Sequence, residues 1–136
     1  MKSTTIRRGL LACAVAVASV ATLSIPGSAH HSTAMFAWGT ATRMDNMTVD
    51  RWEWTNPHTF LYAHTADGTR YAFEGMSPNH LVRYGWSRRS LQPGQVISLT
   101  HYALRDGRNG GFNVTVTLPN GTTLNQFGES GSRTRP

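Results

Sequence analysis

Apolar residues form one nearly uninterrupted stretch close to the N-terminus. Residues 9–25 are apolar apart from small polar side chains, three basic residues precede them, and small residues occupy the −3 and −1 positions of a cut after Ala29. A positive start, an apolar segment and a small-residue cleavage site are typical of a secretory signal peptide. We therefore predict that residues 1–29 are a cleaved signal peptide and that the mature protein resides in the periplasm.

An uncleaved membrane anchor is the alternative for this segment. Seventeen residues is the lower edge of a membrane-spanning length, and no positively charged stop follows them, so cleavage is favoured and no membrane contact is expected afterwards. The Arg7-Arg8 pair resembles a twin-arginine export motif. Ordinary signals also carry paired arginines, so the choice between the Sec and twin-arginine routes stays open.

Beyond residue 47 the apolar positions mostly recur with a period of two, which predicts β-strands. The predicted strands are residues 48–54, 59–65, 70–75, 95–104 and 112–118, with a short last segment ending near Phe127. Asn120-Gly121 predicts a hairpin turn before that segment, and Gly110-Gly111 predicts a loop.

Residues 77–85 change to a helical pattern. Ser77 suits an N-cap, Pro78 suits the first helical position, and Gly85 suits a C-terminal stop. Three strands, a short helix and two or three further strands is the chain order of an OB-like barrel of five or six strands. A two-sheet β-sandwich is the alternative fold.

The mature chain forms a single domain. Removing 29 of 136 residues leaves 107, enough for one domain and too few for two. We predict an irregular lead-in at 30–47, the barrel at 48–127 and a flexible polar tail at 128–136. The only cysteine, Cys13, leaves with the signal peptide, which excludes disulfides, thiol catalysis and cysteine-bound metal from the mature protein.

Charge argues against a nucleic-acid partner. Three of the 13 basic residues lie in the signal peptide, which leaves ten arginines against seven acidic residues, a net charge of +3. The arginines are spread from Arg43 to Arg135 rather than gathered in a stripe, whereas nucleic-acid binding requires a concentrated basic surface.

Several short motifs resemble a known family. They are His30-His31-Ser32, Trp54-Thr55-Asn56-Pro57-His58, Ser77-Pro78-Asn79, Gly85-Trp86 and Leu118-Pro119-Asn120-Gly121. In this order they resemble a group of small exported bacterial proteins classed only as a domain of unknown function. The resemblance implies export and a small β-barrel, and it supplies no activity. One departure is Met47-Thr48-Val49, where the family pattern has Gly-Thr-Val, which puts the start of the first strand in question.

The predicted mature N-terminus is a candidate metal site. Cleavage after Ala29 frees the α-amine of His30, and this amine and the His30 imidazole can chelate one metal ion. A further imidazole from His31 or His58 would complete a nitrogen site that suits Cu(II). Glu74 is either the carboxylate that orients one of these imidazoles or the ion-pair partner of Arg83, the latter being favoured.

No paired carboxylates, catalytic triad or phosphate-binding loop is recognisable, so we predict a protein that is not an enzyme. The alternative to copper binding is a metal-free ligand-binding or protein-interaction module. Its predicted surface consists of Trp52, Trp86 and Arg83, because OB barrels commonly bind extended ligands on one face. His101 shares a strand face with Ile97 and Leu99 and is expected to be a core histidine with its hydrogen bonds satisfied.

Overall fold

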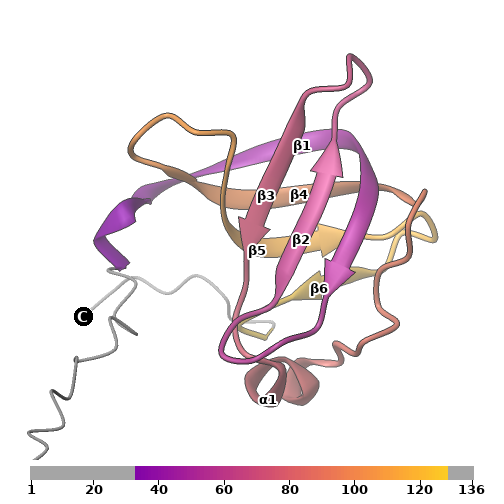
Figure 1. Ribbon diagram of the computed structural model, residues 1–136. Helices are drawn as coiled ribbons and strands as arrows, with labels where there is room; N and C mark the ends of the chain where they lie inside the picture. Colours follow the sequence, from indigo (N-terminus) through magenta and orange to yellow (C-terminus); the bar gives the residue numbers. More distant parts are fainter. Residues whose placement is uncertain (1–32, 129–136) are drawn as a thin grey trace, which may run out of the picture. The chain divides into compact units, whose positions relative to one another are not determined.

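A computed structural model of the chain describes residues 33–128 (Figure 1). The predicted signal peptide, His30, His31 and residues 129–136 lie outside this range. The elements are η1 (Thr33–Met35), β1 (Phe36–Glu53), β2 (Phe60–His64), β3 (Arg70–Glu74), α1 (Pro78–Leu81), η2 (Val82–Tyr84), β4 (Val96–Leu104), β5 (Gly110–Thr117) and β6 (Thr123–Asn125). No helix in this range is long and apolar enough to cross a membrane.

The first strand begins much earlier than predicted. β1 starts at Phe36, so the prediction of an irregular lead-in over 30–47 is wrong from residue 36 onward. This half of β1 is ordered by pairing with β4, for example Ala41 with Tyr102 and Met44 with Leu99. Residues 39–43 are exposed on both faces, so they carry no apolar alternation from which a strand could be predicted.

The strands close into a barrel. Neighbouring strands follow the order β3-β2-β1-β4-β5-β6, and β3 also pairs with β5 in parallel. Strands β1 to β5 therefore form a closed mixed barrel, and β6 is added beside β5. The helix lies between the third and fourth strands, which confirms the predicted OB-like barrel over the β-sandwich.

Two glycines make this closure possible. The residues Gly110 and Gly111 were expected in a loop, but they begin β5 and pair with Ala72 and Phe73 of β3. A Cβ atom at Gly110 would lie 1.9 Å from the Ala72 carbonyl oxygen, and one at Gly111 would lie 2.0 Å from the Tyr102 carbonyl oxygen. The strands approach so closely that no side chain fits, which explains why a turn-like sequence occurs inside a strand.

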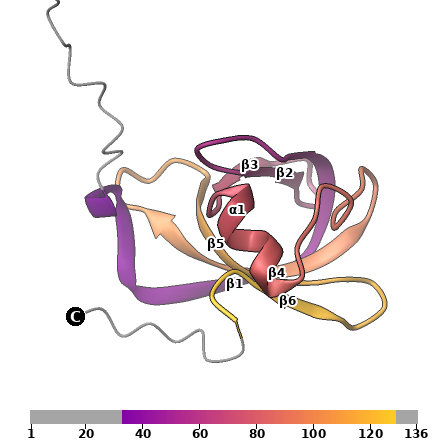
Figure 2. The same cartoon turned by 90° about the horizontal axis from the view of Figure 1, so that it is seen from below.

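The barrel interior is filled by inward-facing residues of every long strand and by the helical segment. The fully buried apolar side chains are Met47, Val49, Leu61, Ala63, Phe73, Leu81, Trp86, Leu91, Ile97, Leu99 and Val116. Leu81 comes from α1, which Figure 2 shows across the end of the barrel seen from below. Ser77 caps α1 by accepting from the His80 N–H, and Gly85 ends η2 with φ of 81°, both as predicted.

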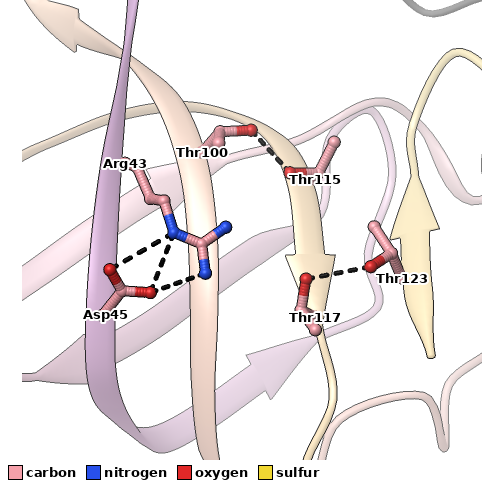
Figure 3. Close-up of polar contacts among 6 residues, drawn as sticks. All are labelled: Arg43, Asp45, Thr100, Thr115, Thr117 and Thr123. Carbon is pink, nitrogen blue, oxygen red and sulfur yellow. Dashed lines mark hydrogen bonds and ion pairs between the residues drawn. The ribbon is translucent and has the colours of Figure 1, made fainter. Parts of the chain in front are cut away.

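The outward face of β4, β5 and β6 carries hydroxyl pairs across neighbouring strands. The Thr100 and Thr115 hydroxyl oxygens lie 2.5 Å apart, and those of Thr117 and Thr123 lie 2.9 Å apart (Figure 3). Cross-strand pairs of this kind contribute to sheet stability. These four hydroxyl groups make the face polar, and they are hydrogen-bonded to one another in pairs.

Candidate functional site

His58 is fixed in the loop between β1 and β2. Its carbonyl oxygen accepts a hydrogen bond from the Thr55 hydroxyl at 3.0 Å, and the next residue, Thr59, donates its N–H to the Met76 carbonyl at 3.3 Å. The imidazole is about one-third exposed, at 32%. The loop therefore holds the His58 backbone on both sides while the ring remains accessible.

The Nδ1 atom of His58 faces two acceptors. It lies 2.9 Å from the Gly75 carbonyl oxygen and 3.3 Å from Oε1 of Glu74. A carbonyl oxygen can only accept, so Nδ1 carries the proton and donates it. The neutral ring then has its lone pair on Nε2, for which the described part of the chain provides no hydrogen-bond partner.

This geometry is the one that orients a metal-binding imidazole. Histidine ligands usually donate their second ring N–H to a carboxylate or a backbone carbonyl, which fixes the tautomer and the ring orientation. His58 has both kinds of partner at once, in Glu74 and Gly75. The Nδ1 side of the ring is therefore held, and Nε2 is the ring nitrogen without a partner among residues 33–128.

Glu74 lies beside an imidazole, as in the alternative that the sequence analysis ranked second. The structure pairs this carboxylate with His58 and not with Arg83. Arg83 is exposed on η2, and within residues 33–128 it makes no ion pair. The favoured Glu74–Arg83 pair is therefore wrong, because the strand brings Glu74 to the side of the β1–β2 loop. The Glu74 side chain is only 14% exposed, which strengthens its interaction with the ring.

The described residues contain only one of the three predicted metal ligands. His30 and His31 lie outside residues 33–128, so their distances to His58 are not part of the structure. Within that range no three His, Cys, Asp or Glu side chains gather closely enough to hold a metal ion. Of the three predicted ligands, the structure therefore describes His58 alone.

The predicted aromatic surface is wrong for Trp86. This side chain is 2% exposed, and its indole N–H donates to the Asn125 carbonyl at 3.1 Å. Gly85, with its positive φ, turns the chain so that the next residue enters the barrel end. Trp52 is half-buried, donates to the Ser87 carbonyl at 3.1 Å and packs 5.7 Å from the Trp86 ring. A Trp52–Trp86–Arg83 ligand surface is therefore not present.

His101 is a core residue, as predicted, but one of its nitrogens is not satisfied. Its ring is 4% exposed and packs edge-on against Phe73, with 5.0 Å between the ring centroids. No hydrogen bond reaches Nδ1 from the described residues. Burial lowers the pKa of His101, an effect that a hydrogen bond with the Thr42 backbone opposes.

The sequence analysis did not identify a second histidine–carboxylate pair. His64 ends β2, and its Nδ1 lies 2.8 Å from Oδ1 of Asp50 on β1. The two residues are 14 positions apart, and a β-bulge between Val49 and Arg51 puts Asp50 beside the strand end. A bulge has no simple sequence signature, so this pair could not be predicted.

The fold and the site together define a small closed β-barrel protein with a carboxylate-anchored histidine in an accessible loop. A family model matches residues 16–113, and the chain belongs to that family, a family of unknown function (DUF6152). This confirms the resemblance inferred from the sequence motifs. No curated protein and no solved structure is significantly similar to the chain.

Proposed function

We propose that this protein is a periplasmic metal-binding protein without enzymatic activity, that its metal is copper, and that His58 is the ligand supplied by the barrel. The observation that carries the proposal is the His58 Nδ1 contact with Gly75 and Glu74, at 2.9 and 3.3 Å. It fixes the tautomer in which Nε2 holds a free lone pair. Neutral imidazole nitrogen is a preferred ligand of copper.

His30 and His31 would supply the remaining ligands. The ring of Phe36, the first residue of β1, lies 5.6 Å from the ring of Phe112. Phe112 is the backbone partner of Glu74 across the β3–β5 pair, so the start of β1 and the His58–Glu74 pair lie on the same side of the barrel. His31 lies five residues before Phe36 in the chain.

The free α-amine makes this proposal specific for the mature protein. An unperturbed α-amine has a pKa of about 7.7–8.0, so a metal ion can displace its proton near neutral pH. The His30 amine and ring then form a chelate, and a further imidazole gives three nitrogen donors, a set that suits Cu(II).

The test is calorimetric titration of Cu(II) into protein that begins at His30. We expect a 1:1 complex whose affinity falls at least about tenfold in His58→Ala, since loss of an outer partner of a ligand alone costs about 10–100-fold. His64→Ala is the matched control, because His64 is also paired with a carboxylate and similarly exposed. It should bind copper as the unmodified protein does.

A second comparison separates the terminal amine from the barrel ligand. Protein with one alanine added before His30 keeps every imidazole but moves the amine, and we expect it to lose most of its copper affinity. Equal weak binding by all four proteins would overturn the proposal. Loss on adding alanine with no effect of His58→Ala would assign the site to the N-terminus alone.

A further inference from the structure

The outward face of β1, β2 and β3 carries a hollow of about 320 Å³. Its lining residues are Asp50, Arg51, Tyr62, Arg70 and Tyr71. Figure 1 shows these three strands side by side. The volume falls at the small end of the range for small-molecule sites, and no residue of the His58 site contributes to it.

The hollow exists because a small residue stands beside a large one. Tyr62 lies between the buried residues Leu61 and Ala63 of β2, so its side chain is on the outward face. Its partner on β3 is Ala72, which is exposed and carries only a methyl group. The space beside the Tyr62 ring is therefore not filled by the neighbouring strand.

One wall of the hollow is flat and held in place. The Arg51 guanidinium lies over the Tyr62 ring at 4.3 Å from its centroid. Arg51 also pairs with Glu53 at 2.9 Å, and the Tyr62 hydroxyl donates to the same carboxylate at 3.4 Å. Three contacts thus fix the two flat groups before any ligand arrives, which lowers the entropic cost of binding.

The charged hydrogen-bond donor that remains open in the hollow is Arg70. Arg70 is exposed, and its guanidinium has no partner among residues 33–128. The Tyr71 side chain shares the face of Phe73 and packs against the core, with its ring parallel to Phe73 and 6.0 Å between centroids, so its hydroxyl is not counted among the outward-facing donors. A ligand that completes the site must therefore bring an acceptor.

The charges select a ligand with one negative charge. Arg51 pairs with Glu53, and the Asp50 carboxylate lies 2.8 Å from Nδ1 of His64, which leaves Arg70 as the one cation lining the hollow without an ion-pair partner among residues 33–128. A planar guanidinium matches a carboxylate with two parallel hydrogen bonds. The Asp50 carboxylate also lines the hollow, and its negative charge opposes a dianion such as phosphate more than a monoanion.

We infer that this hollow binds a small aromatic carboxylate. The carboxylate binds the Arg70 guanidinium, and the ring packs on the wall formed by Arg51 and Tyr62. This inference concerns a different face from the proposed copper site and does not depend on metal binding.

The experiment is a titration of the ¹⁵N-labelled protein with benzoate, followed by amide chemical shifts. We expect shifts confined to β1, β2 and β3 around the hollow. Benzyl alcohol, which has the ring without the charge, and inorganic phosphate, which has the charge without the ring, should each bind at least about tenfold more weakly. Phosphate binding as tightly as benzoate would overturn the assignment.

Two variants and one control make the test specific. Arg70→Gln should weaken benzoate binding about tenfold or more by removing the charged donor, and Ala72→Phe should abolish it by filling the hollow. Both positions are exposed on β3, and phenylalanine is well tolerated in strands, so the same spectra will show a folded barrel. Arg83→Gln, an exposed arginine on η2, should bind normally. Unchanged binding in Arg70→Gln would refute the inference.

Discussion

His101 of β4 and Asn113 of β5 are cross-strand neighbours in the barrel, and neither side chain completes its hydrogen bonds. They are 4% and 1% exposed. Buried polar atoms without partners cost free energy relative to water. Unpaired polar atoms therefore already lower the stability of the core at this pair, and a charge placed there would lower it further.

Acidification should destabilise the barrel through His101. Burial lowers the pKa of its ring below 6.5 in the folded state. Below pH 6.5 the His101 ring is therefore protonated to a greater extent in the unfolded chain than in the native protein. The free energy of unfolding should then fall with pH, by up to about 1.4 kcal/mol per pH unit, until the folded pKa is reached. Urea denaturation between pH 7.5 and 5 measures this fall in the free energy of unfolding.

His101→Gln provides the control for this pH dependence. The substitution removes the titrating group, so the slope between pH 6.5 and 5 should become shallower than in the unmodified protein. An unchanged slope would show that another group is responsible.

The Gly110 closure predicts a severe effect of one methyl group. Gly110→Ala puts a Cβ atom 1.9 Å from the Ala72 carbonyl oxygen, at φ of 135°, so β3 and β5 must separate. We expect a loss of at least about 3 kcal/mol in stability, or no folded protein. Gly107→Ala is the matched control: φ is also positive, at 78°, but no atom lies within 4 Å, so only about 1 kcal/mol should be lost.

Trp86→Ala should unfold the protein rather than affect a ligand. The side chain is buried at the barrel end and hydrogen-bonded to Asn125, so its removal leaves a large cavity at a cost of about 3–5 kcal/mol. Thermal unfolding followed by circular dichroism measures the change. Arg83→Ala, three residues earlier and exposed, should leave the midpoint nearly unchanged.

The Thr100–Thr115 hydroxyl pair should show measurable coupling. In a double-mutant cycle with Thr→Val at both positions, the hydrogen bond seen in Figure 3 should give an interaction free energy of about 0.2–1 kcal/mol. Pairing Thr100→Val with Thr123→Val, which lies on another strand and bonds to Thr117, should give additive effects. Coupling in the second cycle would contradict the pairwise picture.

If His58 binds copper, Glu74→Gln should weaken the complex by about 10–100-fold, because the neutral amide holds the imidazole less firmly and makes it less basic. Glu53→Gln is a suitable control, since Glu53 pairs with Arg51 on another part of the sheet. Calorimetry under the conditions used for His58→Ala gives the comparison. Equal losses in both carboxylate variants would indicate a general charge effect.

Local patterns predicted the fold wherever a strand has one buried face. Alternation from Phe112 to Leu118 located β5, and the Ser77 and Gly85 signals located the helical segment. The first half of β1 could not be predicted, because residues 39–43 are exposed on both faces and its partners on β4 lie 55 to 68 residues later. Whether such a segment forms a strand depends on its pairing with a distant segment.

The site was predictable only as a set of residue types. His58 stood out because Pro57 restricts the loop, and Glu74 because it follows a buried phenylalanine. Their contact depends on the pairing of β2 with β3, which sets Phe60 opposite Glu74. The burial of Trp86 had no local signal, since it results from the empty space that the closed barrel leaves at its end.

The parallel pairing of β3 with β5 has a consequence for how the chain acquires its structure. A polypeptide that emerges N-terminus first contains β1, β2 and β3 long before Gly110 and Gly111 arrive to meet Ala72 and Phe73. The partner of the long first strand, β4, comes only shortly before these glycines, and without β5 the apolar interior is open. Non-local contacts of this kind make folding slow. Most of the chain must therefore be available before the barrel can close, so closure is a late step of folding.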